Sequence, residues 1–327
     1  MMNRSTANFL TACISDKSKR EKRREELTKL DLSFSIRKGL AEIVAGVIPH
    51  KMTRNQCRGI LRYGPIRVLK LRREVYRHRE VVPKYYLAVC TMAKNEGPYF
   101  KEWIEWHHNL GVEKFYIYDN ESTDNTKEIL APYVASGLVE YIFWKGVKQQ
   151  LPIYDDCLDR HRLDTRWMAV IDLDEFIVPI QDKTIPQFLS RFEEASAIEI
   201  NWLCYGSGGA DKKVEGGVME RFKQHAEPDH ILNRHVKSIV NPRRVVSFIG
   251  AHEVARMSGK TFDSHGQPVR KHFRDRDPQQ DVIRINHYAV KSYEEFLGKR
   301  ARGRSRTLDI RGMDYFERFD LNDIEEE

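Results

Sequence analysis

From Tyr85 onward the sequence alternates between short apolar runs rich in β-branched and aromatic residues and longer runs of helical character. The first run is YYLAVCTMA. The stretch after it, GPYFKEWIEWHHNLG, has Pro98 near its start and Gly111 just past its end, both common signals of helix boundaries. The pattern repeats through KFYIYD, a helix containing Pro132 that we expect this proline to disturb, and LVEYIFW. Strands alternating with helices predict an α/β fold with a mostly parallel sheet covered on both faces.

Polar residues that follow the predicted strands form three clusters. KNE follows the first strand and DNESTD follows the second. DLDE comes at the end of the fourth predicted strand, WMAVIDLDEFIV, which is read as a single strand from Trp167 to Val178. In parallel α/β sheets, ligands bind beyond the carboxyl ends of the strands. The three clusters are therefore expected to converge on one crevice.

The third cluster contains two carboxylates, Asp172 and Asp174, one residue apart. On an extended strand both would point to the same side. Adjacent anions repel each other unless a positive charge lies between them. A hard divalent cation, Mg²⁺ or Mn²⁺, suits such oxygen ligands and would in turn bind a diphosphate. Salt bridges, or a cap on the following turn, are the structural alternative.

The second cluster places Asp119 and Asn120 at a strand exit. A carboxylate in this position of a nucleotide-binding α/β domain can accept a hydrogen bond from a ribose hydroxyl or a base N–H group. Helix capping by Ser122 or Asp124 is the alternative. The sequence has neither GxGxxG nor GxxxxGK[ST], so neither the dinucleotide fingerprint nor the P-loop accounts for these acids.

Composition indicates a soluble, globular protein. The 327 residues are 41% hydrophobic and 31% charged, and no stretch reaches the roughly 18 to 20 consecutive apolar residues of a membrane-spanning helix. The first twenty residues resemble a signal peptide poorly, because their basic residues mainly follow the short apolar patch. A cytoplasmic location is expected. The five cysteines form no CxxC pair, which favours reduced, mostly buried thiols.

The positive charge belongs to the N-terminal quarter, since residues 1–84 hold 21 Lys and Arg against 8 Asp and Glu. This charge suits a solvated helical face, or contact with nucleic acid or an anionic membrane. The amphipathic stretch IRKGLAEIVAGVIPHK could lie on lipid at the inner membrane face or pack on the main domain. Residues 1–84 are therefore predicted as a basic, mostly helical extension. Residues 85–305 form the predicted main domain, and residues 306–327 a C-terminal tail.

Three motifs in order, TMAKNEGPYFKEWIEWHHNLGVEKFYIYDNESTDNT, YDDCLDRHRLDTRWMAVIDLDEF and INHYAVKSYEEFLGKRARG, resemble GT-A glycosyltransferases of the family-2-like and family-92-like groups. The resemblance covers about residues 85–303. It implies a GT-A, Rossmann-like fold, a nucleotide-sugar donor (a UDP-sugar favoured) and a divalent metal on the DxD motif. It also implies sugar transfer to a glycan or lipid-linked acceptor, in surface polysaccharide or glycoconjugate synthesis. Positions implied for the nucleotide and donor are Asn95, Glu96, Asp119, Asn120, Asp156 and Arg160.

The resemblance also implies a late histidine as a third metal ligand, and the two candidates are His252 and His287. Cations that suit diphosphate neutralisation are Lys237, Lys291, Lys299 and Arg302, with a solvated basic face as the alternative for the last two. An inverting enzyme also needs a carboxylate base. The candidates are Asp211, Glu215, Glu220 and Glu253, of which Glu253 adjoins a candidate ligand. The xED motif of many family-2 enzymes is missing from this region.

Two functional hypotheses follow from these observations. The first is a metal-dependent glycosyltransferase, for which no nucleic-acid partner is expected. The second is a basic-armed protein that binds nucleic acid or anionic lipid without catalysis, in which the DxD motif is structural. A nucleotidyltransferase is a more distant alternative, because the glycine-rich, basic phosphate loop expected after its first strand is replaced here by TMAKNE.

Overall fold

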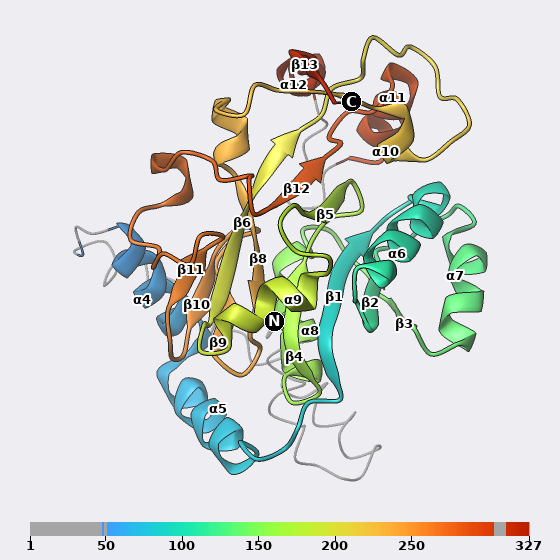
Figure 1. Ribbon diagram of the computed structural model, residues 1–327. Helices are drawn as coiled ribbons and strands as arrows, with labels where there is room; N and C mark the ends of the chain where they lie inside the picture. Colours follow the sequence, from blue (N-terminus) through green and yellow to red (C-terminus); the bar gives the residue numbers. More distant parts are fainter. Residues whose placement is uncertain (1–47, 49–50, 304–311, 327) are drawn as a thin grey trace.

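The computed structural model describes residue 48, residues 51–303 and residues 312–326 (Figure 1). A mixed sheet forms the centre of this part of the chain. Its strands, in spatial order, are β3 (Val139–Phe143), β2 (Lys114–Asp119), β1 (Tyr85–Ala93), β4 (Thr165–Val170), β8 (Val236–Val240), β6 (Ala197–Cys204), β12 (Ile283–His287) and β5 (Glu175–Pro179), with β11 (Thr261–Asp263) also paired to β6. Most of the strand pairings are parallel, as predicted.

The parallel half, β3-β2-β1-β4, is covered by helices on both faces. Alternate residues of β1 face opposite ways: Leu87 and Val89 pack in one core cluster with residues of α6 (Phe100–Asn109) and α7 (Thr126–Ala135). Ala88 and Cys90 pack in a second cluster with α8 (Gln150–His161). The strands are almost wholly buried, which is why their sequences read as continuous apolar runs. Pro132 lies inside α7 without ending it.

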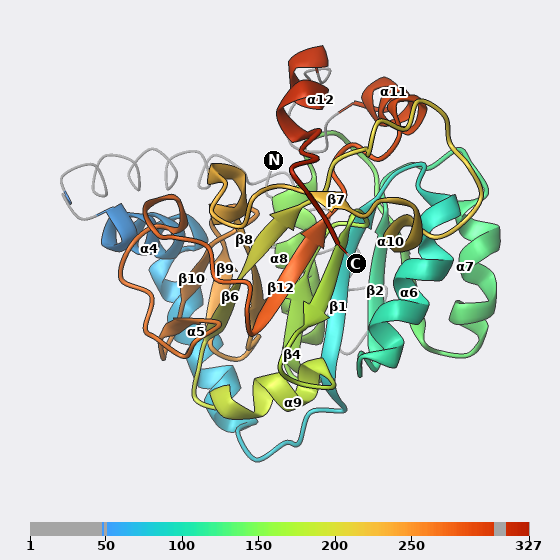
Figure 2. The ribbon, with the colours of Figure 1, turned by 45° about the horizontal axis from the view of Figure 1, so that its top comes forward.

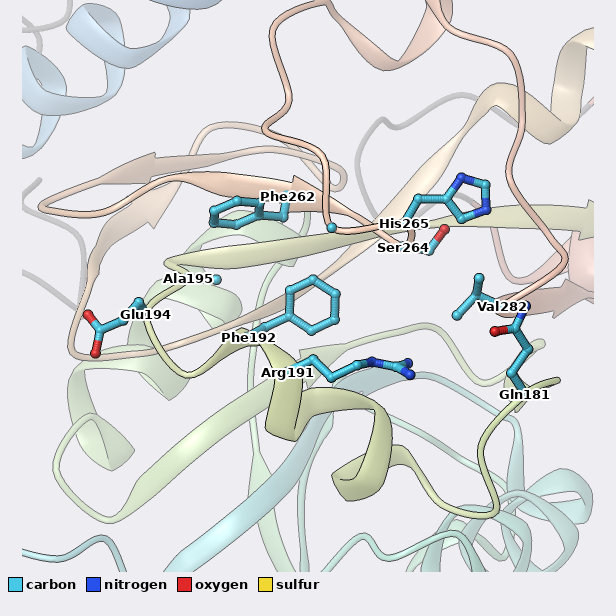
Figure 3. Close-up of a pocket in the computed structure, with 10 residues that line it drawn as sticks. Gln181, Arg191, Phe192, Glu194, Ala195, Phe262, Ser264, His265 and Val282 are labelled. Carbon is cyan, nitrogen blue, oxygen red and sulfur yellow. The ribbon is translucent and has the colours of Figure 1, made fainter.

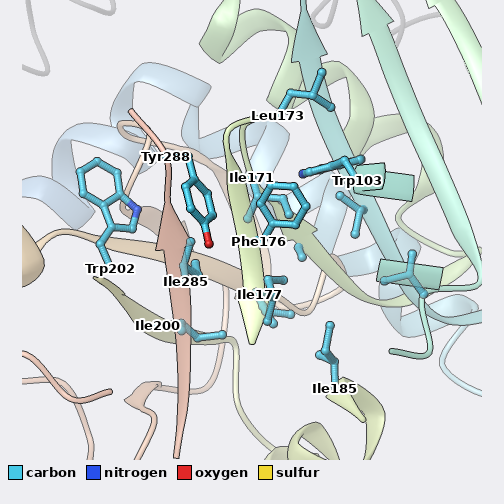
Figure 4. Packing of buried hydrophobic residues seen from close by; sticks show 14 of the residues in the cluster. Trp103, Ile171, Leu173, Phe176, Ile177, Ile185, Ile200, Trp202, Ile285 and Tyr288 are labelled. Carbon is cyan, nitrogen blue, oxygen red and sulfur yellow. The ribbon is translucent and has the colours of Figure 1, made fainter. Parts of the chain in front are cut away.

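The prediction of one strand from Trp167 to Val178 is wrong. β4 ends at Val170, and the chain turns through Ile171–Asp174 before β5 begins at Glu175 on the far edge of the sheet. Ile171 and Leu173 of this turn are buried, and Figure 4 shows them in the core beside Trp103 and Phe176. Apolar residues on both sides of the acids look alike in one strand or two, so the pattern alone did not reveal the break.

The remaining elements surround the sheet. They are α4 (Lys51–Tyr63), α5 (Pro65–Arg77), α9 (Ile185–Leu189), α10 (Val218–Arg221), α11 (Tyr293–Ala301), α12 (Met313–Phe319), the short helices η1 (Gly97–Tyr99), η2 (Ser190–Phe192), η3 (Ile231–Arg234) and η4 (Phe273–Asp275), and the paired strands β9 (Val245–Phe248) with β10 (Val254–Arg256) and β7 (Gln224–His225) with β13 (Ile324–Glu325). Helix α4 docks on the β9–β10 pair, where Gln56 Nε2 donates to the Val254 carbonyl at 2.7 Å. None of the described helices has the length and apolarity needed to cross a bilayer.

Some predictions fall partly outside the described residues. The amphipathic stretch IRKGLAEIVAGVIPHK lies almost wholly outside the described residues, as does Cys13. The four described cysteines are free thiols, and three of them are buried, as expected. The domain boundaries at residues 84 and 305 stay predictions.

Candidate active site

The acidic turn, residues 171–174, lies at the carboxyl end of β4, as expected for a ligand-binding edge. Its backbone is fixed from two sides. The Asp172 N–H donates to Glu175 Oε2 at 2.8 Å, and the Tyr288 N–H donates to the Asp174 carbonyl at 2.8 Å. Because His287 is opposite Glu175 in the β12–β5 register, the end of β12 brings His287 to the same turn.

Asp172 is paired with a buried lysine. Lys237 Nζ, from β8, lies 2.8 Å from Asp172 Oδ2 and 3.2 Å from Glu175 Oε2, and its side chain is 2% exposed. Burial alone would lower the pKa of Lys237, but the two carboxylates outweigh it and hold that pKa well above its usual value. Burial raises the pKa of Glu175 to about 8 despite Lys237. Lys237 thus balances the charge of Asp172 from within the protein.

Asp174 is paired with a second lysine and lies beside a histidine. Lys299 Nζ donates to Asp174 Oδ2 and, at 2.6 Å, to the Ala289 carbonyl. Although burial opposes it, Lys299 keeps the pKa of Asp174 well below the usual range. His287 Nε2 lies 3.9 Å from Asp174 Oδ1, and burial lowers the pKa of His287 to about 3, so its imidazole is neutral at pH 7. In this structure the positive charges that balance the two aspartates are therefore those of two lysines.

Helix α11 supplies Lys299 and is held by a buried ion pair. Arg221 contacts Glu295 through two hydrogen bonds of 2.9 Å, with side chains 7% and 3% exposed. Glu295 also forms a capping box with Ser292, and the Tyr99 hydroxyl donates to it at 2.9 Å. This network fixes the start of α11, and its far end then reaches the acidic turn.

The first two polar clusters interlock. The Asn95 N–H donates to Ser122 Oγ at 2.9 Å, and the Thr123 N–H donates to Asn95 Oδ1 at 2.7 Å. Arg302, just after α11, donates to the Asn95 carbonyl at 3.1 Å and to the Glu96 carboxylate. All three clusters thus lie at one edge, with the end of α11 joining the first to the third, and their convergence on one crevice stays a prediction.

Backbone strain marks the same edge. Asn95 and Lys291 have φ angles of 53° and 59°, values that residues other than glycine seldom adopt. Strain of this kind clusters at functional sites. Lys291 is buried, and burial lowers its pKa to about 8.

Asp119 opens onto a cavity of about 340 Å³ at the ends of β2 and β3, which is also lined by Tyr141 and Lys127. Asp119 Oδ2 accepts from the Tyr141 hydroxyl at 2.5 Å, and Oδ1 accepts from the Ser122 N–H at 2.8 Å. Asn120 is turned away, because its amide donates to the Trp144 and Gly146 carbonyls. This cavity is large enough to receive part of a nucleotide.

Asp156 and Arg160 contact each other within α8. Arg160 Nε donates to Asp156 Oδ2 at 2.6 Å, and the Tyr118 hydroxyl donates to the same oxygen at 3.0 Å. Asp156 is fully buried, whereas the Arg160 side chain is 33% exposed. Their role in lining a donor pocket stays a prediction.

His252 and Glu253 lie next to β10. His252 Nδ1 donates to the Val236 carbonyl at 2.6 Å, and its ring packs against Trp202. Glu253 accepts from Asn55 at 3.2 Å and lies 3.8 Å from His272 Nε2. His287, by comparison, lies beside the acidic turn, with its Nε2 atom 3.9 Å from Asp174 Oδ1.

The side chains at the turn are of the types that bind a divalent cation, but in this structure the two aspartates are paired with lysines. Two carboxylates and the Nε2 atom of His287 are ligands that Mn²⁺ accepts. Among the described residues, however, no three His, Cys, Asp or Glu side chains are arranged to hold a metal together. At Asp174 one carboxylate oxygen, Oδ2, already binds Lys299. A metal bound through Oδ2 of Asp174 would have to displace Lys299, whereas Oδ1 lies 3.9 Å from His287 Nε2.

A second cavity, of about 420 Å³, lies at the opposite end of the sheet (Figure 3). Its apolar lining is Phe192, Ala195, Phe262 and Val282. Its charged rim is paired internally, because Arg191 binds Asp182 at 2.6 Å and His265 binds Asp281 at 2.7 Å. This cavity is separate from the acidic turn.

Sequence reasoning missed Glu175 and the Arg221–Glu295 pair. Glu175 is part of DLDE, but nothing in the sequence shows that its carboxylate is buried against Lys237. Ser292 and Glu295 form the S-x-x-E signature of a capping box, a signal that was readable from the sequence. Arg221 has no comparable signal.

Comparison with known proteins identifies the family of the chain. The profile described as "Glycosyltransferase family 92" matches residues 84–327. The chain belongs to this family. A rice protein, glycosyltransferase family 92 protein Os08g0121900, is 29% identical over 221 residues, 65% of this chain and 35% of the rice protein. Galactan beta-1,4-galactosyltransferase GALS3 of Arabidopsis thaliana is 26% identical over 217 residues, 60% of this chain and 42% of its own length.

The chain spans about a third of the length of the first of these curated relatives. Among solved structures, S. aureus TarS in complex with UDP is similar at a TM-score of 0.32 and 13% identity, over 48% of this chain and 47% of TarS. That likeness is too weak to bear on the site. Of the two groups suggested by the motifs, family 92 is thus confirmed.

Proposed function

We propose that this chain is a metal-dependent glycosyltransferase that moves a hexosyl group from a nucleotide-diphosphate sugar to a hydroxyl of a glycan or lipid-linked acceptor. The observation that carries the proposal is the acidic turn at the carboxyl edge, with Lys237 paired to Asp172 and Lys299 paired to Asp174. Family membership supports glycosyl transfer. The name of the Arabidopsis relative makes UDP-galactose the first donor to test.

In this proposal Asp172, Asp174 and His287 hold the cation. When bound, the cation neutralises charge on the diphosphate and on the leaving group. Lys299, once released from Asp174, is placed to bind a donor phosphate, because its ammonium already lies beside the carboxylate that would hold the metal ion.

The residues around the Asp119 cavity bind the nucleotide in this proposal. Asp119 accepts from a ribose hydroxyl or base N–H, and Asn95 holds Ser122 and Thr123, which line the cavity. Tyr141 orients the Asp119 carboxylate through its 2.5 Å hydrogen bond. The catalytic base stays open, with Glu253 as a prediction from the sequence.

The rival hypothesis of a binding protein without catalysis is not retained, since the chain belongs to a glycosyltransferase family. Cytoplasmic location stays a prediction.

The test is a screen of nucleotide sugars with the full chain, read by release of nucleoside diphosphate with and without Mn²⁺. Asp174→Asn should lower turnover at least about 100-fold, since it removes charge from the proposed metal site. The control is Asp277→Asn, because Asp277 is 93% exposed and pairs only with surface Arg234 in the described structure. Turnover of Asp174→Asn equal to that of wild type in Mn²⁺, or wild-type turnover that chelator does not lower, would refute the proposal. Mn²⁺ binding and thermal melting of the variant separate a lost site from a lost fold.

A further inference from the structure

Helix α5 has an inner face that packs on the protein and an outer face that nothing in the described structure covers. On the inner face Leu71 is 1% exposed and packs with Val246 and Ala255, with Val68 and Val75 beside it. The outer face carries three large apolar side chains, Ile66 at 71%, Leu69 at 65% and Tyr76 at 65% exposure. An exposed apolar stripe of this kind marks an interaction surface.

The spacing of these residues makes the stripe continuous. Positions 66, 69, 73 and 76 follow the helical repeat and lie on one side of α5. Val81 and Val82, in the loop that follows, are 47% and 86% exposed. In the described part of the chain, five of the thirteen exposed large apolar side chains fall within residues 66–82.

Positive charge surrounds the stripe. Residues 65–84 contain seven Lys and Arg but only two Glu. The exposed cations are Lys70, Arg72, Arg73, Arg77, Arg79 and Lys84. Arg73 lies within the stripe itself, where its long stem can lie along apolar groups while the guanidinium reaches phosphate. Of the two acids, Glu80 pairs with Arg79 at 3.1 Å.

We propose that the outer face of α5, together with Val81 and Val82, docks this protein on an anionic membrane surface. Apolar side chains rimmed by cations are the pattern of a helix that lies in the headgroup layer. A second copy of the chain would bring two cationic faces together and is disfavoured by repulsion. A nucleic-acid backbone would satisfy the cations but leave the central apolar stripe in water.

Docking through α5 also fixes the orientation of the acidic edge, the carboxyl end of the sheet at which the acidic turn lies. Tyr63 and Arg67, on either side of the α4–α5 junction, contact Asp159 near the end of α8, at the amino end of the sheet. β1 runs nine residues from that end to the acidic edge, roughly 30 Å. Figures 1 and 2 show α5 and α11 at opposite ends of the molecule. The acidic edge thus faces away from the lipid. If the proposed transferase function holds, its acceptor is a glycan that extends from the membrane rather than a sugar at headgroup level.

The experiment is co-sedimentation of the full chain with vesicles of phosphatidylcholine, alone or with about 30% phosphatidylglycerol. We expect salt-sensitive binding to the anionic vesicles only. Binding should fall at least about tenfold in Ile66→Ser/Leu69→Ser/Tyr76→Ser and in Lys70→Gln/Arg73→Gln/Arg77→Gln. The matched control is Val214→Ser/Ile231→Ser, whose side chains are 59% and 67% exposed elsewhere on the surface, and which should bind as wild type does.

Wild-type binding in both triple variants would overturn the proposal, as would equal binding to neutral vesicles or release of the bound protein by competing RNA. Thermal melting confirms that each variant is folded. Nucleotide-sugar hydrolysis without vesicles should be unchanged in the α5 variants. Absence of hydrolysis in every protein, wild type included, would count against the proposed function and leave the docking result intact.

Discussion

The buried Arg221–Glu295 pair offers a quantitative test of how α11 is held at the acidic edge. The perturbation is Glu295→Gln, which keeps the size of the side chain but removes its charge. The variant leaves Arg221, 7% exposed, without its ionic partner. It also weakens the capping box with Ser292 at the start of α11, the helix that carries Lys299.

The magnitude follows from the pKa of Glu295. Burial alone would raise that pKa, but hydrogen bonds from Arg221 and Ser292 outweigh it and lower the pKa from 4.5 to about 2. A shift of this size corresponds to about 3 kcal/mol of folding free energy at pH 7. Because the pKa is lowered on folding, this stability is present above pH 4.5 and is lost as the pH falls towards 2.

The assay is urea denaturation of wild type and Glu295→Gln. At pH 7 the variant should lose about 3 kcal/mol of unfolding free energy, and by about pH 3.5 the difference should narrow by about 1 kcal/mol. The control is Glu80→Gln, since the Arg79–Glu80 pair is exposed and should contribute less than about 1 kcal/mol. A Glu295→Gln variant as stable as wild type at pH 7, or a difference that does not change with pH, would refute the reasoning.

Two further predictions concern the acidic turn, and a Mn²⁺ titration followed by electron paramagnetic resonance measures both. His287→Ala should weaken Mn²⁺ binding at least about tenfold and His252→Ala much less, because His287 Nε2 lies 3.9 Å from Asp174 Oδ1 whereas His252 Nδ1 donates to the Val236 carbonyl. Equal effects of the two variants would contradict this assignment. Lys299→Met should tighten Mn²⁺ binding, since it removes the ammonium that occupies Asp174, while lowering release of nucleoside diphosphate. Weaker Mn²⁺ binding in this variant would show that Lys299 does not compete with the metal.

The sequence predicted the parallel half of the fold closely. YYLAVCTMA and KFYIYD coincide with β1 and β2, because strands buried on both faces read as unbroken apolar runs bounded by turn residues. The same rule failed at residues 167–178. There the chain is apolar on both sides of the acids, although it leaves β4, in the middle of the sheet, and continues as β5, the last strand in the order that begins with β3.

The candidate site was predicted in its acids but not in their partners. Asp172 and Asp174 stand together in the sequence, whereas Lys237 and Lys299 are 65 and 125 residues away from the acids they bind. Which cation meets which acid depends on β8 lying beside β4 and on the anchoring of α11. Neither arrangement leaves a local pattern in the sequence.

The central claim is that the acidic turn exchanges an internal ammonium for a divalent cation when the donor binds. The most direct measurement is the anomalous scattering of a crystal of the full chain soaked with MnCl₂ and a UDP-sugar. Our account predicts a manganese peak on Asp172, Asp174 and His287, with Lys299 moved from Asp174 to the diphosphate. A crystal in which UDP-sugar is bound, Lys299 still contacts Asp174 and no manganese peak lies at the turn would contradict it.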